Sequence, residues 1–155
     1  MKSIILYCSN KGTTEKLAKK IGRDFGSELI KVEPRDSYGN FFAAVARVAK
    51  EKRAKVSVEV STEVPELQEY DTVFVGYPIW YGTVPAFMKE YLSACDLQGK
   101  TVIPFATSAG SPIRGSLKDL EEACAGAVVR YPLGYSVMKR DNYQDWKNQV
   151  EQLSL

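Results

Sequence analysis

The sequence predicts an α/β fold, a three-layer α/β/α sandwich around a doubly wound, five-stranded parallel sheet. Runs of β-branched and aromatic residues alternate along the chain with segments of helical periodicity. The clearest strand candidates, 2–8 and 71–78, are apolar at nearly every position, as strands covered on both faces are. The length of 155 residues suits one domain, and we expect residues 1–155 to form it.

Five segments are expected to form the strands. Each is short, and turn-forming residues or a helical pattern follow it. Pro132 is expected to interrupt the last strand, and 55–60 is a further, weaker candidate because its apolar residues alternate. The five expected strands cover residues 2–8, 27–34, 71–78, 100–107 and 127–137.

Helices are expected between the strands, wherever apolar residues recur every three or four positions. The first begins at Thr14, the second covers 40–53, and Ser116-x-x-Asp119 indicates the start of the fourth. Asp141 is expected to cap the last. The inward side chains are expected to include Leu17, Ala18, Ile21 and Phe25, then Val84, Phe87, Met88, Tyr91 and Leu92, then Leu117, Leu120 and Cys124, and finally Tyr143, Trp146, Val150 and Leu153.

Composition excludes several kinds of chemistry. The chain has no histidine, which excludes imidazole-based catalysis and His-ligated metal sites. Cys8, Cys95 and Cys124 are far apart in sequence, and we expect buried free thiols rather than disulfides or a metal site. No stretch approaches the roughly 18 apolar residues of a membrane span, so we expect a cytoplasmic protein with no membrane partner.

The charge is unevenly distributed along the chain. Residues 1–55 contain 13 Lys and Arg against 6 Asp and Glu, a net charge of +7, whereas residues 56–155 carry −5. Much of the excess lies in "KLAKK" and "KEKRAK", on helix faces that point away from the apolar stripes. A solvated face is the simpler interpretation, and an anionic partner is the alternative. Since no nucleic-acid-binding motif accompanies the cations, we expect no nucleic-acid partner.

Three loops follow the carboxyl ends of predicted strands, where open parallel sheets bind ligands. The first offers hydroxyls, a glycine and the N–H groups of a helix start, which together suit an anion. The second carries two large aromatic rings before a glycine, and the third is long, small and polar. The candidate binding residues are Ser9, Asn10, Lys11, Gly12, Thr13 and Thr14, then Tyr77, Pro78, Ile79, Trp80, Tyr81 and Gly82, and finally Thr107, Ser108, Ala109, Gly110 and Ser111.

Each loop also has an explanation that needs no cofactor. The first would be a helix cap, the second a hydrophobic cover or a protein-binding patch, and the third an ordinary surface loop. Together, a phosphate site, an aromatic surface and a polar edge suit FMN, which has a phosphate at one end and a flat isoalloxazine at the other. Without a ligand, the rings of Trp80 and Tyr81 are expected to be exposed. One or both are expected to pack on the flavin, and Trp80 is favoured for its larger π-surface.

The segments "YCSNKGTTEKLAKKI", "YDTVFVGYPIWYGTVP" and "FATSAGS" resemble the flavodoxin family, in particular members with a YPxW flavin loop. The resemblance covers most of the chain and implies strand order 2-1-3-4-5 and non-covalent FMN. It implies that residues 9–14 hold the phosphate, 77–82 flank the isoalloxazine, and 107–111 border its pyrimidine edge or other face. Lys11 replaces the usual first threonine of the phosphate loop, and the net charge of +2 differs from the acidic character typical of electron-shuttling members.

The resemblance implies a one-electron carrier that uses the semiquinone and hydroquinone states of FMN and exchanges electrons with redox partner proteins. The alternative on the same fold is an NAD(P)H-dependent quinone or flavin reductase. It ranks lower because it needs a second nucleotide pocket, for which the sequence shows no motif. A third interpretation has no cofactor and makes 77–83 a protein-binding patch.

Overall fold

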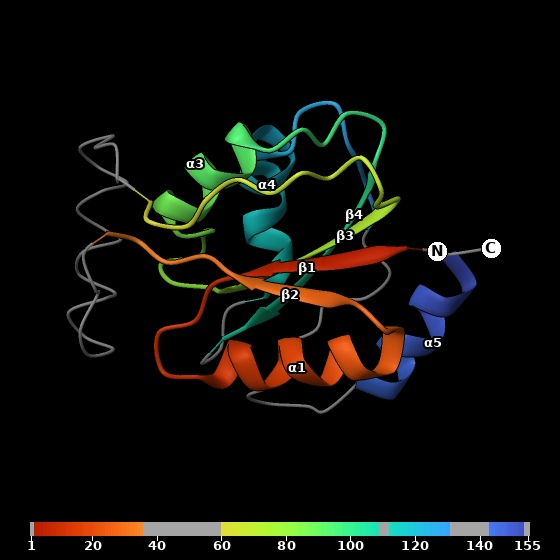
Figure 1. Cartoon of the computed structure of the whole chain (residues 1–155). Coiled ribbons are helices and arrows are strands. Elements are labelled where there is room, and N and C mark those ends of the chain that lie inside the picture. The colour runs from red at the N-terminus through yellow and green to blue at the C-terminus, as the bar shows by residue number, and fades with distance from the viewer. Residues whose placement is uncertain (1, 36–59, 109–111, 131–142, 154–155) are drawn as a thin grey trace.

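The computed structural model describes residues 2–35, 60–108, 112–130 and 143–153 (Figure 1). The predicted helix 40–53, the capping role of Asp141, the interruption at Pro132 and all but the last residue of the candidate strand 55–60 lie outside these ranges. The described elements, in chain order, are β1 (Ser3–Tyr7), α1 (Thr13–Phe25), β2 (Glu28–Lys31), β3 (Thr72–Pro78), α3 (Ala86–Ala94), β4 (Thr101–Thr107), the 3₁₀ turn η1 (Ile113–Ser116), α4 (Leu117–Ala123), β5 (Val128–Val129) and α5 (Tyr143–Leu153).

The five strands form one parallel sheet in the order β2-β1-β3-β4-β5, which confirms the predicted topology. β1 pairs with β2 on one side and with β3 on the other, so the direction of winding reverses at β1. In open α/β sheets a ligand binds outside the carboxyl ends of the strands at such a reversal. The topology alone therefore predicts a ligand site at the loops that follow β1 and β3.

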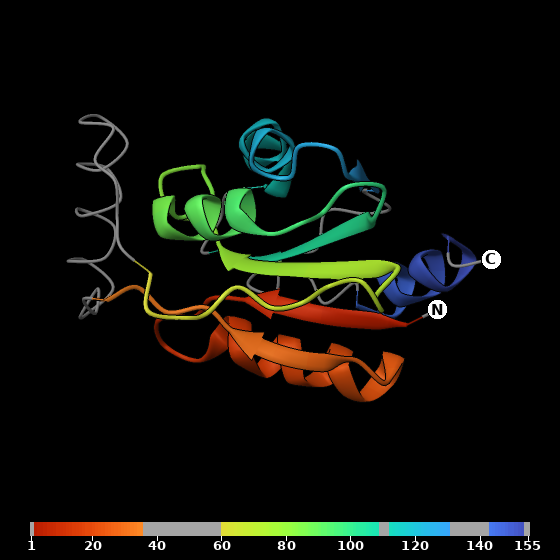
Figure 2. The same cartoon turned by 45° about the horizontal axis from the view of Figure 1, so that its top comes forward.

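Helices cover both faces of the sheet, as expected for a three-layer sandwich (Figure 2). α3 and α4 pack on one face, and α1 and α5 pack on the other. Successive strand residues alternate between the two cores: Val73 and Val75 face α3 and α4, whereas Phe74 faces α1 and α5. This double coverage explains why the central strands β1, β3 and β4 are apolar at most positions, whereas the edge strand β2 is largely exposed.

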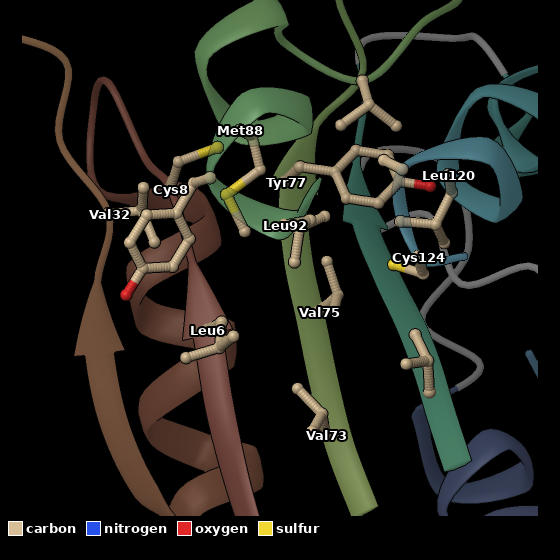
Figure 3. Packing of buried hydrophobic residues seen from close by; sticks show 14 of the residues in the cluster. Leu6, Cys8, Val32, Val73, Val75, Tyr77, Met88, Leu92, Leu120 and Cys124 are labelled. Carbon is tan, nitrogen blue, oxygen red and sulfur yellow. The ribbon is translucent and has the colours of Figure 1, made fainter. Parts of the chain in front are cut away.

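The core under α3 and α4 holds most of the predicted inward residues of that side. Figure 3 shows Val75 of β3 beside Leu92 of α3, with Val73 further along the same strand and with Leu120 of α4 and Cys124 against the neighbouring part of the sheet. All are buried. The predicted face of the helix after β3 is confirmed, since its inward residues are all buried, namely Val84, Phe87, Met88, Tyr91 and Leu92.

The prediction for the end of the last helix is wrong. Leu153, expected to face inward, is 42% exposed because it lies in the final turn, beyond Val150, the last α5 residue in the core. β2 is also shorter than the predicted 27–34. Among the described residues, no helix is both long enough and apolar enough to cross a membrane.

The three cysteines are buried free thiols, as predicted. Burial raises the pKa of the Cys95 thiol to about 11 and that of the Cys124 thiol to about 12, and it raises the pKa of Cys8 as well. The cause is desolvation, which disfavours the thiolate. The fold therefore keeps all three thiols protonated at neutral pH.

These thiols should make the protein sensitive to alkali. Unfolded thiols ionise near pH 8.5, whereas the folded ones retain their protons, so the unfolded state binds fewer protons above that pH. We expect the thiols' contribution to the free energy of unfolding to be constant below about pH 8, and the free energy of unfolding to fall as the pH rises from about 8.5 toward 11. Urea unfolding at several pH values measures this. A free energy that rises over the same interval, or rapid thiol labelling of the native protein, would contradict it.

Candidate functional site

Hydrogen bonds join the three candidate loops at the carboxyl edge of the sheet. The side-chain hydroxyls of Thr14 and Thr107 lie 2.7 Å apart and are both buried, which ties the start of α1 to the end of β4. The Ile79 N–H donates to the Thr107 carbonyl at 2.8 Å, which ties the loop after β3 to the same strand end. The predicted loops are therefore neighbours. Ala109, Gly110 and Ser111 lie outside the described residues.

The N-terminus of α1 has the features of an anion site. Its cap residue, Gly12, provides no side-chain cap, so the first-turn N–H groups receive no such partner. The Gly12 N–H donates to Ser9 Oγ at 3.0 Å, and because that oxygen accepts, the Ser9 hydroxyl proton is available to a ligand. Lys11 and Thr13 are exposed beside it. Donors and the positive end of the helix dipole thus converge where a phosphate would lie.

The acidic residue of the first turn of α1 is directed elsewhere. Glu15 accepts a hydrogen bond from the Tyr7 hydroxyl at 3.1 Å, and its carboxylate lies 3.8 Å from Lys31 Nζ. The Tyr7 hydrogen bond and the Lys31 charge lower the pKa of Glu15. Burial, together with the same hydrogen bond, raises the pKa of Tyr7 to about 12. Glu15 therefore joins α1 to β1 and β2.

The loop after β3 contains a tight turn over Trp80–Thr83. The Thr83 N–H donates to the Trp80 carbonyl at 3.3 Å, and both central residues have positive φ, 58° at Tyr81 and 69° at Gly82. A type I′ turn requires positive φ at both central positions. Glycine adopts this conformation without steric cost, but a tyrosine is strained by it. Tyr81 is nevertheless 56% exposed. Strained backbone conformations cluster at ligand-binding sites, and this turn follows β3, which ends at the same edge of the sheet as β1.

The structure contradicts the expectation that the Trp80 indole is exposed without a ligand. Trp80 is 7% exposed and packs in the core on the α3 side, because the turn directs Tyr81 outward and a large apolar ring is more stable against the core than in water. Tyr77 is fully buried too, with its hydroxyl 2.8 Å from Ser116 Oγ. Pro78 and Ile79 are also buried, whereas Gly82 is partly exposed.

The Trp80–Thr83 turn is anchored to α4. The Thr83 hydroxyl donates to the Asp119 carboxylate, which also lies 3.9 Å from Lys89 Nζ. The predicted helix start is confirmed, since α4 begins directly after Ser116, although the buried hydroxyl of this residue makes no cap bond and donates instead to the Ile113 carbonyl at 2.7 Å. The Ser-x-x-Asp pattern thus marks two anchors of the neighbouring loop rather than a capping box.

Replacing Asp119 by alanine should loosen this turn. The Thr83 hydroxyl, in a residue that is 2% exposed, loses its partner, which costs about 1–3 kcal/mol. We expect a lower melting temperature and weaker binding of any ligand that contacts the turn. Asp119→Asn keeps an acceptor and should restore most of both. Equal ligand affinities in the alanine and asparagine variants would show that Asp119 does not position the turn.

A cleft of about 380 Å³ opens at the carboxyl ends of β1, β2 and β3. It includes Ser9, Asn10, Pro78 and Trp80 among the predicted residues, but not the described part of the third loop. Sequence reasoning missed its other wall, although the parallel arrangement implies that β2 ends at this edge too. That wall is lined by Lys31, Val32, Glu33, Pro34, Arg35 and Ser61. Within the described ranges, no group of three or more acidic or cysteine side chains is placed to hold a metal.

Comparisons with known proteins agree with this geometry. Residues 2–151 match the flavodoxin family model. A crystallised candidate flavoprotein from Bacteroides eggerthii is 27% identical, with 99% of this chain and 98% of that chain covered and a TM-score of 0.84.

More distant structures show the same fold. A Lactobacillus acidophilus flavoprotein in complex with FMN is 24% identical, with a TM-score of 0.76 over 94% of this chain and 97% of that chain. An NADH:FMN oxidoreductase is 21% identical, with a TM-score of 0.62 over 100% and 90%. A search of curated proteins gave no match. Because the family model spans nearly the whole sequence, the chain belongs to the flavodoxin family.

Proposed function

We propose that the three loops hold FMN at the carboxyl edge of the sheet and that the protein carries single electrons between redox proteins. The observation that carries this proposal is the joining of an uncapped helix N-terminus to an exposed aromatic turn by the Thr14, Thr107 and Ile79 hydrogen bonds. A phosphate fits the first feature, and a flat ring fits the second.

The residues present suit the two ends of FMN. The Ser9 hydroxyl and the first-turn N–H groups of α1 would bind the phosphate, with Lys11 adding positive charge. Tyr81 would cover the ring system, and the Gly82 backbone offers hydrogen bonds that no side chain obstructs. FMN supplies reversible redox chemistry when bound, while the protein provides orientation and electrostatics. Thr14 and Tyr77 support the site from the core rather than by side-chain contact.

An electron carrier is favoured because a carrier needs only a cofactor edge near solvent, and the turn proposed to cover the ring is at the surface. The cleft beside Trp80, with Lys31 and Arg35 in its wall, is the observation that favours an NAD(P)H-dependent reductase as second candidate. Anaerobic stopped-flow mixing of the FMN-loaded protein with NADH or NADPH separates the two. We expect bleaching far slower than with a one-electron donor protein, and rapid bleaching by either nucleotide would establish the reductase.

Tyr81→Gly should separate stability from binding. Glycine relieves the strained positive φ, which costs a non-glycine residue about 1 kcal/mol, so the ligand-free variant should be slightly more stable than the wild type. It removes the ring proposed to cover the flavin, and we expect FMN affinity to fall about tenfold. Thermal melting and FMN fluorescence titration measure the two effects. Unchanged affinity would exclude Tyr81 from the flavin site.

A further inference from the structure

The exposed face of α1 carries a row of cations, which we call the α1 basic stripe: Lys16, Lys19, Lys20 and Arg23. Lys19 and Lys20 each lie three or four positions from both Lys16 and Arg23, so the four side chains project from one face of the helix. Lys16, Lys19 and Arg23 are exposed and Lys20 is partly exposed, whereas the opposite face, which includes Leu17, is buried. The stripe contains all three lysines of the "KLAKK" segment and therefore accounts for its positive charge.

The described part of the chain neutralises little of this charge. Lys19 Nζ lies 3.8 Å from a Glu15 oxygen, but that carboxylate is shared with Lys31. Lys16 and Arg23 form no ion pair with any described residue.

The remaining carboxylate on α1 is also occupied by other residues. Asp24 accepts a hydrogen bond from the Tyr143 hydroxyl at 2.6 Å and pairs with Lys147 at 3.7 Å. Lys20 Nζ lies 3.9 Å from the centre of the Tyr143 ring, a contact that leaves its charge intact. The stripe thus keeps most of its positive charge.

The stripe is unfavourable for the helix that carries it. Like charges three or four positions apart repel on a helix surface, and all four residues are so related. Lys16 also lies in the early part of α1, where the helix dipole disfavours a cation. A face that served only solubility would mix charges of both signs. The four cations outnumber the two carboxylates of α1, Glu15 and Asp24, and such an excess suits an anionic partner.

The stripe begins next to the proposed cofactor site. Lys16 is one turn beyond Thr13, on the helix whose N-terminus is assigned to the FMN phosphate. A partner seated on α1 would lie close to the cofactor edge, and opposite charges would accelerate its approach.

We propose that the α1 basic stripe is the docking surface for an acidic redox protein. This rests on the proposed function: the partner gives one electron to the bound FMN, or accepts one from it. A nucleic acid fits less well, because α1 carries no amide side chain to read bases, and the Tyr143 ring beside Lys20 is buried and cannot stack on them.

The test measures binding of the FMN-loaded protein to soluble cytochrome b5, an acidic haem protein, by isothermal titration calorimetry. We expect binding at low ionic strength that weakens at least about tenfold at high salt, and none to the basic cytochrome c. Lys16→Gln with Arg23→Gln should weaken cytochrome b5 binding roughly three- to tenfold. Lys118→Gln with Arg130→Gln is the matched control. It removes two exposed cations away from α1, and it should change the affinity less than about twofold.

Three results would overturn the proposal: no binding to cytochrome b5, equal losses in the two double variants, or a double-stranded DNA bound more tightly than cytochrome b5 through the same stripe. FMN titration of every variant separates this proposal from the function on which it rests. If the wild-type protein does not bind FMN, the proposed function is wrong. Charge-dependent docking to the stripe is measurable with or without FMN, so it is tested independently. The stripe variant should also melt at the wild-type temperature or higher, because it relieves repulsion.

Discussion

Thr13→Asp is expected to weaken FMN binding about a hundredfold while leaving the ligand-free protein as stable as the wild type or slightly more so. Thr13 is the exposed first residue of α1. A carboxylate there interacts favourably with the helix dipole, by about 0.3–1 kcal/mol. The same carboxylate would face a phosphate dianion, and repulsion of about 3 kcal/mol corresponds to roughly a hundredfold in affinity.

Two controls make the Thr13 result specific. Asparagine has nearly the shape of aspartate but no charge, so the Thr13→Asn variant should bind FMN within about threefold of the wild type. Riboflavin, which lacks the phosphate, should bind the aspartate variant and the wild type equally. If Thr13→Asp binds FMN normally, or loses riboflavin to the same degree, the phosphate does not lie at the N-terminus of α1.

Gly76→Ala is expected to destabilise the fold by about 3 kcal/mol, near the upper end for overpacking a core. Gly76 of β3 pairs with Phe105 of β4, and a Cβ at this position would overlap the Phe105 ring. That ring cannot move aside easily, because it is fully buried and contacts Trp146 edge-on, with centroids 6.5 Å apart. Urea unfolding gives the free energy.

Gly115→Ala is the matched control for Gly76→Ala. Its Cβ would meet the Gly82 carbonyl at an ordinary 3.7 Å, so the change should stay within about 0.5 kcal/mol. Phe105→Leu added to Gly76→Ala should recover part of the loss, since a smaller side chain makes room for the methyl group. If Gly76→Ala alone does not fold, this double variant keeps the comparison measurable. Wild-type stability of Gly76→Ala would show that Phe105 does not lie over the glycine.

Much of the fold follows from the sequence because parallel strands covered on both faces must be apolar throughout. The runs 2–8 and 71–78 have this character, and β1 and β3 lie within them. The positions of the loops follow as well, since the carboxyl ends of parallel strands share one edge. The conformation of a tight turn does not follow from composition, so the sequence could not show that Tyr81 points outward while Trp80 packs inward.

Two other features depend on contacts between distant segments. Ser116 and Asp119 match a helix start by spacing, but their roles are decided by Tyr77 and Thr83, which approach from β3 and the turn after it. The second wall of the cleft brings Ser61 to the end of β2. No local pattern encodes these contacts, because they exist only after the sheet has formed.

The most direct measurement is the titration of the ligand-free protein with FMN, followed by flavin fluorescence and the visible spectrum. If the loops after β1, β3 and β4 hold the cofactor, FMN binds in a one-to-one complex and its absorption bands shift as the ring leaves water. Flavin signals that stay those of free FMN at every protein concentration would contradict the assignment of this edge as a flavin site.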